Sequence, residues 1–157
     1  MRSILTVCAL IIMQETLIAQ SENQSNHNHR YEIGIANGLV YFLNEKEFSY
    51  GLHTHVVRVI GKSNFAIGVG YERIFDQHGH NTVSAVISYL LVERLTLNVA
   101  PGIAFTNSNK GLIEFSIHLE STYEFEIKNF HIGPLVEWAI EPDETHFTIG
   151  LHVGFGL

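Results

Sequence analysis

The feature that most constrains this chain is a two-residue alternation that runs from Tyr31 to the C-terminus. In residues 112–127, one set of alternate positions is almost entirely apolar, and the other carries mostly glutamate, histidine, serine and threonine. Residues 145–157 repeat the pattern, with glycine and histidine on the second face. A strand sorts successive side chains onto two faces, whereas a helix would scatter them around its axis. The pattern therefore predicts β-strands with one apolar face each.

Eight such segments follow one another, separated by short polar connections. Each is long enough to cross a bilayer as a tilted strand, which takes about 9–11 residues. Short connections make neighbouring strands antiparallel, and eight twisted antiparallel neighbours close into an up-and-down barrel. The predicted strands are residues 31–42, 47–60, 64–75, 82–92, 94–105, 112–127, 129–140 and 145–157.

The apolar face of these strands is predicted to face lipid. The opposite face is rich in glycine and alanine, which suits the crowded inside of a narrow barrel. Charged residues make up only 16% of the chain, against about 25% in a typical soluble domain. Aromatic residues gather at the strand ends, as Tyr41 and Trp138 do at one end and Tyr89 and Phe155 at the other, with aliphatic residues between. Two aromatic girdles around an aliphatic belt are typical of a transmembrane barrel.

With these features the chain resembles the family of small, eight-stranded Gram-negative outer-membrane β-barrel proteins. The resemblance covers residues 31–157 and includes the apolar-alternating C-terminal strand. Proteins of that family commonly have a C-terminal aromatic residue that the barrel-assembly machinery recognises. Here the last residue is Leu157, and Phe155 lies two positions earlier. The resemblance implies an all-β transmembrane barrel in the cell outer membrane, surrounded by lipid and inserted by that machinery as a monomer.

Residues 1–19 are predicted to form a cleaved signal peptide. Arg2 precedes an apolar run at 4–13, which is too short for a membrane helix and typical of a signal-peptide core. Residues 20–30 are polar, contain His27 and His29, and are predicted to form a flexible tail before the barrel domain at 31–157. The net charge of −7 excludes nucleic acid as a partner.

The inward-facing positions carry glutamate and histidine but, by parity, no lysine or arginine. A carboxylate away from water needs a proton or a partner. The expected hairpin registers pair Glu124 with His131, His118 with Glu137, His131 with His152, and Glu137 with His146, so two sets should gather. His53 should face Glu72 across another hairpin. The predicted sets are Glu124, His131 and His152, and His118, Glu137 and His146.

Three interpretations of this interior remain open. It is a hydrogen-bonded network that fills the barrel without any cofactor, a site for a divalent transition metal such as zinc, copper or nickel, or a pH-responsive element.

The main functional prediction is a structural, envelope-related barrel without catalysis, and the alternative is metal handling at the envelope. A lipid-modifying enzyme would need Ser116, His118 and Glu120 to cooperate, but inward positions two apart on one strand lie about 6.5–7 Å from each other. A diffusion pore is excluded, because eight strands enclose a filled core.

Overall fold

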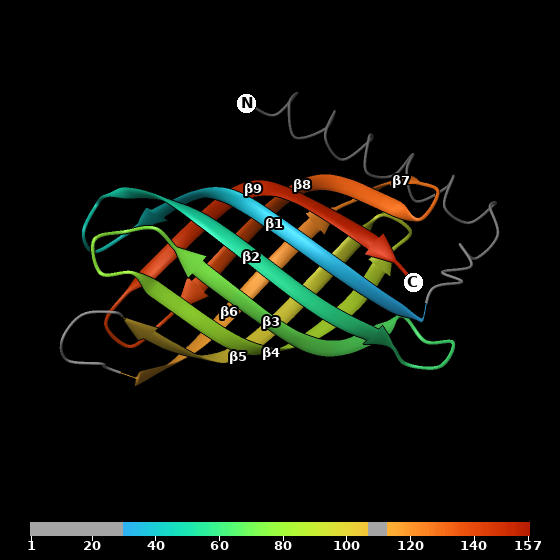
Figure 1. Ribbon diagram of the computed structural model, residues 1–157, viewed down its shortest axis with the longest axis horizontal. Coiled ribbons are helices and arrows are strands. Elements are labelled where there is room, and N and C mark those ends of the chain that lie inside the picture. The colour runs from blue at the N-terminus through green and yellow to red at the C-terminus, as the bar shows by residue number, and fades with distance from the viewer. Residues whose placement is uncertain (1–29, 107–112) are drawn as a thin grey trace, which may run out of the picture.

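The computed structural model describes residues 30–106 and 113–157, which form a closed antiparallel β-barrel (Figure 1). The signal peptide predicted for residues 1–19, and all but the last residue of the predicted tail, lie outside the described residues. Within the described ranges, no helix has the length and apolar character that a membrane-spanning helix needs.

The barrel contains nine strand elements that make up eight barrel strands. Each barrel strand pairs antiparallel with its neighbours in the chain, including β6 with β8, and the pairing of β1 with β9 closes the barrel. Elements β6 and β7 are two parts of one barrel strand, interrupted at Glu124. The elements are β1 Tyr31–Phe42, β2 Phe48–Val59, β3 Phe65–Ile74, β4 His80–Val92, β5 Leu95–Thr106, β6 Ile113–Tyr123, β7 Phe125–Ile127, β8 Phe130–Ile140 and β9 Thr145–Gly156. The predicted eight-stranded fold is confirmed, and the bounds agree with the predicted ranges to within two residues.

The interruption at Glu124 coincides with a proline in the facing strand. Thr122 pairs with Leu135 and Phe125 with Ile132, so the unbroken register sets Pro134 opposite Tyr123. Proline has no N–H to donate to a neighbouring strand, which explains why the regular pairing lapses here. The Glu124 N–H instead donates to the Arg94 carbonyl on the other side, at 2.7 Å.

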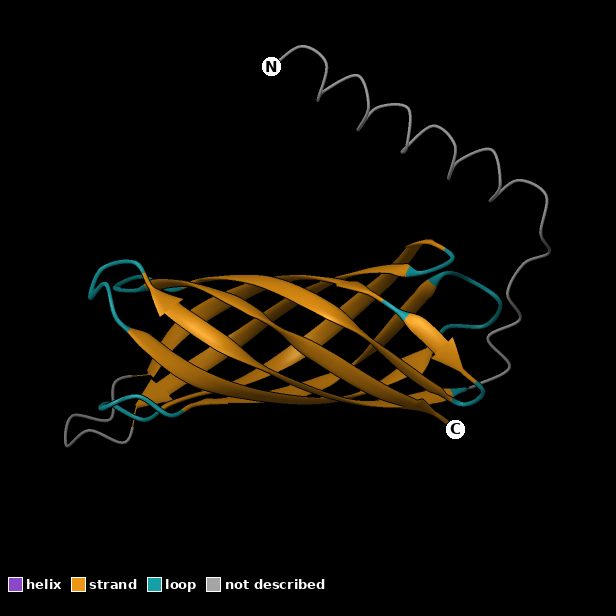
Figure 2. Cartoon of the chain, turned by 90° about the horizontal axis from the view of Figure 1, so that it is seen from above, coloured by secondary structure: helices purple, strands orange, loops and turns teal. Residues whose placement is uncertain are grey.

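The outer surface of the barrel is apolar over its whole height. Exposed isoleucine, leucine and valine side chains cover the middle of the strands, and aromatic pairs from neighbouring strands lie at the two ends. Trp138 stacks on Phe147 at the end that holds the loops following β1, β3 and β8, and Phe130 packs on Phe155 at the end that holds both described termini. Figure 2 shows these two ends on either side of the strand region. An exposed apolar band between aromatic girdles fits lipid, as the sequence predicted.

The interior is mostly polar and is packed around glycines. A side chain at Gly154 would collide with the His131 ring, and one at Gly34 would collide with the His55 and His152 rings. Two small groups of buried apolar side chains interrupt this interior, one around Val57 and Val86 and the other formed by Val40, Phe42 and Ile74. The small residues predicted for the inward face therefore make room for imidazole rings.

Candidate metal centre in the barrel interior

The barrel interior collects carboxylates and imidazoles without a basic partner. Among the buried polar residues of the described part are five glutamates and five histidines, but no lysine or arginine. Arg58 and Arg73 lie outside the barrel, as predicted, where their guanidinium groups sit over the rings of Tyr31 and Phe75 at 5.8 and 5.4 Å. The interior acids therefore have histidines, protons or a bound cation to balance them.

Four of these residues, from four different strands, form what we call the His146 cluster. It consists of Glu72 on β3, His118 on β6, Glu137 on β8 and His146 on β9. One ligand atom from each lies within 4.8 Å of the other three. The His118 Nδ1 atom lies 3.3 Å from Glu72 Oε2 and 3.5 Å from Glu137 Oε2. The cluster is closed to solvent, with Glu137 2% and His146 1% exposed.

The polar atoms of the His146 cluster are poorly satisfied by hydrogen bonds. Within the described residues, Glu72 Oε2, His118 Nε2 and both ring nitrogens of His146 have no hydrogen-bond partner. Leaving such a buried group unpaired costs about 1–3 kcal/mol. Zinc–ligand bonds of about 2.0–2.2 Å imply neighbouring ligand atoms about 3.3–3.5 Å apart in a tetrahedral site. The two His118 contacts have that spacing, and the remaining ligand atoms of the cluster lie within 4.8 Å of one another.

A second group, the His152 cluster, lies towards the end that holds the described termini. It consists of Glu32, His131 and His152, with His131 Nε2 at 3.3 Å from Glu32 Oε1. Glu124 lies beside it, with Oε1 at 3.9 Å from His131 Nε2 and 3.7 Å from His152 Nδ1. The predicted set of Glu124, His131 and His152 thus meets in space, with Glu32 as a further carboxylate.

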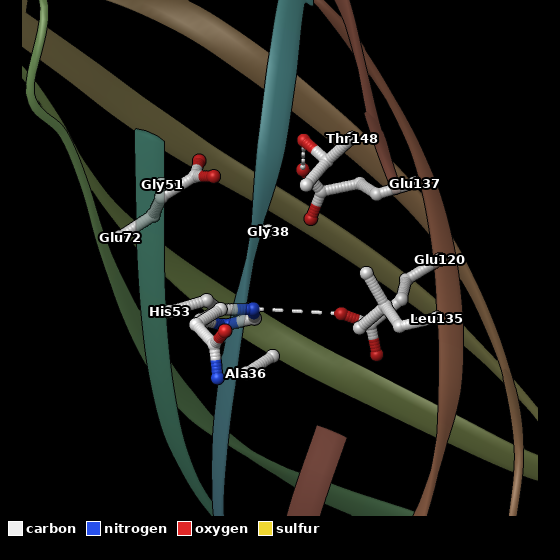
Figure 3. Close-up of a pocket in the computed structure, with 10 residues that line it drawn as sticks. Ala36, Gly38, Gly51, His53, Glu72, Glu120, Leu135, Glu137 and Thr148 are labelled. Atoms are coloured by element: carbon white, nitrogen blue, oxygen red, sulfur yellow. Dashed lines mark hydrogen bonds and ion pairs between the residues drawn. The ribbon is translucent and has the colours of Figure 1, made fainter. Parts of the chain in front are cut away.

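A third group, the His53 cluster, consists of His53, Glu120 and Glu137, so it shares Glu137 with the His146 cluster. His53 Nδ1 lies 3.5 Å from Glu120 Oε2 across the interior, as the dashed line in Figure 3 shows. His53 also pairs with Glu72 between β2 and β3, as predicted.

The predicted pairings around β8 were wrong by two residues. The turn between β7 and β8 contains only Lys128 and Asn129, with Lys128 at φ 60, so Ile127 pairs directly with Phe130. After β8, Ile140 pairs with Thr145. Long side chains reach their diagonal neighbours across strands, so the predicted residues still meet. The actual backbone pairs are Glu126 with His131, Glu120 with Glu137, Gly133 with His152 and Ala139 with His146.

Sequence reasoning missed the carboxylates that reach these clusters from distant strands. Glu72 was expected only beside His53, and Glu32 and Glu120 were assigned no cluster. Glu72 and Glu137 lie on opposite walls, four strands apart in either direction around the barrel. Their inward parity was visible in the sequence, but their meeting depends on closure of the barrel.

The loop end of the barrel carries a further histidine–carboxylate arrangement, outside these three clusters. The Gly79 and His80 N–H groups donate to Asp76 Oδ1 at 2.6 and 3.0 Å, and His80 Nδ1 lies 2.6 Å from Asp76 Oδ2. Burial alone would raise the pKa of Asp76, but the backbone and ring of His80 hold that pKa below its usual value. This loop caps the start of β4, which begins at His80 rather than at residue 82 as predicted.

Beside this loop lies an acidic mouth with a cavity of about 290 Å³. Burial raises the pKa of Glu141 on its wall. No lysine or arginine is among the described residues that line the cavity. Its titratable lining residues are Glu45, His78, His80, Glu114, Glu141, Asp143 and Glu144.

The residues considered for lipid chemistry do not form a nucleophile–base pair. Ser116 is fully buried, and its Oγ has no hydrogen-bond partner among the described residues. An activated serine needs a base within hydrogen-bond reach. His118 instead contacts Glu72 and Glu137.

Comparison with known proteins identifies the architecture. Neither a protein-family model nor a curated protein matches the chain. The structure of Neisserial surface protein A aligns with a TM-score of 0.59 and 7% identity over 81% of this chain and 96% of that one. The attachment invasion locus protein Ail of Yersinia pestis aligns with a TM-score of 0.53 and 17% identity, over 81% and 96%. The N-terminal β-barrel domain of Pseudomonas aeruginosa OprF aligns with a TM-score of 0.54 and 17% identity, over 82% and 98%.

The chain therefore has the fold of the small eight-stranded outer-membrane β-barrels, as its sequence predicted. At these identities the likeness establishes the fold and leaves the role to be argued from the residues themselves. The apolar outer surface and this fold agree with the predicted location in the cell outer membrane.

Proposed function

We propose that this outer-membrane barrel binds a divalent transition metal ion inside the barrel, at the His146 cluster, and has no catalytic role. The observation that carries the proposal is the meeting of two imidazoles and two carboxylates from four strands. The buried polar residues of the part that the structure describes include no lysine or arginine. Imidazole with carboxylate is a donor set suited to zinc and its neighbours.

The acidic mouth supports this proposal, because it would concentrate cations at the end of the barrel nearest to the His146 cluster. A cavity lined by one sign of charge raises the local concentration of the opposite ion. The mouth and the His146 cluster are separated by Phe42, whose ring centroid lies 5.5 Å from that of His80 and 5.2 Å from that of His146.

The metal content of the refolded protein tests the proposal. The protein is refolded in detergent, dialysed against trace Zn²⁺, Cu²⁺ and Ni²⁺, desalted, and measured by mass spectrometry. We expect retained metal that falls in the His118→Ala/His146→Ala variant and persists in a His78→Ala control, whose side chain is exposed. A His27→Ala/His29→Ala variant corrects for binding by the tail. Metal at background level, or equal metal in the His118→Ala/His146→Ala variant, refutes the proposal.

A structural, envelope-related role without a ligand is the second candidate. It is favoured by the close filling of the interior, where the cavity near His53 measures only about 10 Å³. On this view the histidines and glutamates are packing and hydrogen-bond partners, as in the Asn98 Nδ2 donation to Glu120 Oε1 at 2.6 Å. A deletion strain with weakened envelope integrity, restored equally by wild type and by the His118→Ala/His146→Ala variant, would support this role over metal binding.

Lipid modification is tested separately with Ser116→Ala. Because Ser116 is buried and unpaired, we expect identical lipid A in strains that carry the wild type, this variant or a deletion. A change in lipid A that depends on Ser116 would restore the enzymatic alternative.

A further inference from the structure

We infer that the barrel holds two metal ions side by side, the second bound by His53 and Glu120 and joined to the first through the carboxylate of Glu137. This inference rests on the proposed metal binding at the His146 cluster. It adds a second metal site, a carboxylate bridge between the two ions and a stoichiometry of two ions per barrel.

Glu137 is placed to serve both ions. It is the one residue common to the His146 and His53 clusters. Its Oε2 lies 3.5 Å from His118 Nδ1, on the side of the first ion, and its Oε1 accepts a hydrogen bond from Thr148 Oγ1 at 3.3 Å. A carboxylate oxygen has two lone pairs, so Oε1 can keep the threonine and still bind a metal.

The carboxylate of Glu120 is held in place while leaving one oxygen unused. Asn98 Nδ2 donates to Oε1 at 2.6 Å, and Thr122 Oγ1 donates to the same oxygen at 3.3 Å. Within the described residues, Oε2 has no hydrogen-bond partner, and neither has His53 Nδ1, which lies 3.5 Å away. Glu120 is only 5% exposed. Polar partners that orient a ligating carboxylate are a regular part of metal sites.

A small cavity lies between these groups (Figure 3). Its volume is about 10 Å³, and His53, Glu72, Glu120 and Glu137 all line it. That is close to the least space that holds one water molecule, about 10–15 Å³. The rest of the lining is formed by Ala36, Asn37, Gly38, Gly51, Leu135 and Thr148. Three protein ligands with a water in the fourth position is a common zinc arrangement, and this cavity supplies the position for the water.

The shared carboxylate of Glu137 would keep the two ions close together. Metal ions that share ligands in two-metal protein sites lie about 3.5–4 Å apart. The two clusters share one residue, and within each cluster the ligand atoms lie within 4.8 Å of one another. The first ion takes Glu72, His118, His146 and one oxygen of Glu137. The second takes His53, Glu120 and the other oxygen.

The test counts metal ions and asks whether they are adjacent. The full chain is loaded with Cu²⁺ in detergent, in a His131→Ala/His152→Ala background that disables the His152 cluster. We expect two Cu²⁺ per barrel and an electron paramagnetic resonance spectrum with the half-field signal of a coupled pair. Adding His53→Ala/Glu120→Gln should leave one Cu²⁺ with an ordinary single-ion spectrum.

The control is Ser116→Ala, a buried change on the same strand as His118 and Glu120 that removes no cluster ligand. It should keep both ions and their coupling. One Cu²⁺ that is unaffected by His53→Ala/Glu120→Gln overturns the inference and leaves the proposed function standing. Two ions without magnetic coupling would contradict the inference that both ions bind the carboxylate of Glu137. No bound Cu²⁺ overturns both proposals.

Discussion

Replacing Gly133 with alanine should destabilise the barrel where β8 meets β6 and β7. A Cβ atom at this position would collide with the Tyr123 carbonyl and would lie 3.1 Å from Glu124 Cα. All of these atoms belong to the backbone of the neighbouring strand, so no side-chain rotation relieves the contact. The two strands would have to separate by more than an ångström, which breaks nearby inter-strand hydrogen bonds.

The magnitude follows from two opposing effects. Overpacking against a rigid neighbour costs about 1–3 kcal/mol, and each lost hydrogen bond adds about 1 kcal/mol. Alanine offsets about 0.4–1 kcal/mol of this cost, because it restricts the conformations of the unfolded chain more than glycine does. We therefore expect Gly133→Ala to lower the free energy of unfolding by about 2–3 kcal/mol. Because β8 carries both His131 and Glu137, the same change should reduce metal retention.

The matched control is Gly51→Ala. A Cβ atom there would meet the Val40 side chain at 2.8 Å and Glu72 Oε1 at 3.8 Å, and no backbone atom within 4 Å. We expect a change of less than about 1 kcal/mol, because a side chain can shift. The assay is guanidinium unfolding in lipid vesicles, followed by the fluorescence of the single tryptophan of the chain, Trp138. Equal losses of stability in the two variants would refute the reasoning from strand contact.

Three further predictions concern the loop, the metal and the lipid-facing surface. The pKa of Asp76 is lowered in the folded barrel, so the stabilisation that its carboxylate provides is present above the unfolded pKa near 3.8 and is lost as the pH falls through the lower folded pKa. Asp76→Asn should remove this acid-dependent part of the amide-exchange protection at the start of β4. An unchanged pH profile of that protection would contradict the prediction. Free metal at 100 times the dissociation constant of the His146 cluster should contribute about 2.7 kcal/mol to the stability of the wild type through that cluster. Guanidinium midpoints should therefore rise more in the wild type than in His118→Ala/His146→Ala, and equal shifts would place the metal outside the His146 cluster. Trp138, which is 42% exposed on the outer face, should be quenched by brominated lipids, and a failure of quenching would argue against membrane insertion through this surface.

The alternation of the sequence predicted which side of the wall each residue faces, but not the height at which it faces its neighbours. The parity of His118, Glu137 and His146 was correct because a strand has a period of two whatever its partner. The register of His118 against Glu137 depended on the turn at Lys128, whose positive φ allows a two-residue connection. That of His146 depended on the connection between Ile140 and Thr145. A register shift by two keeps every side chain on its predicted face, which explains why the clusters were predicted although the backbone pairs were wrong.

The contribution of Glu72 could not be read from local sequence, because it reaches Glu137 from the opposite wall of the barrel. Hairpin reasoning compares neighbouring strands only. The start of β4 escaped prediction for a different reason, since Asp76 accepts hydrogen bonds from the N–H groups of Gly79 and His80 and so organises the residues before the apolar alternation begins.

The ligands of the two adjoining clusters are distributed over β2, β3, β6, β8 and β9. A linear chain, or a sheet that has not yet joined β9 to β1, holds no complete set of them. A slip of one residue in any of these five strands would turn its ligand towards the lipid. Bound metal would therefore act as an assembly reporter: the metal-to-protein ratio of a purified sample would count the fraction of molecules that had closed in the correct register.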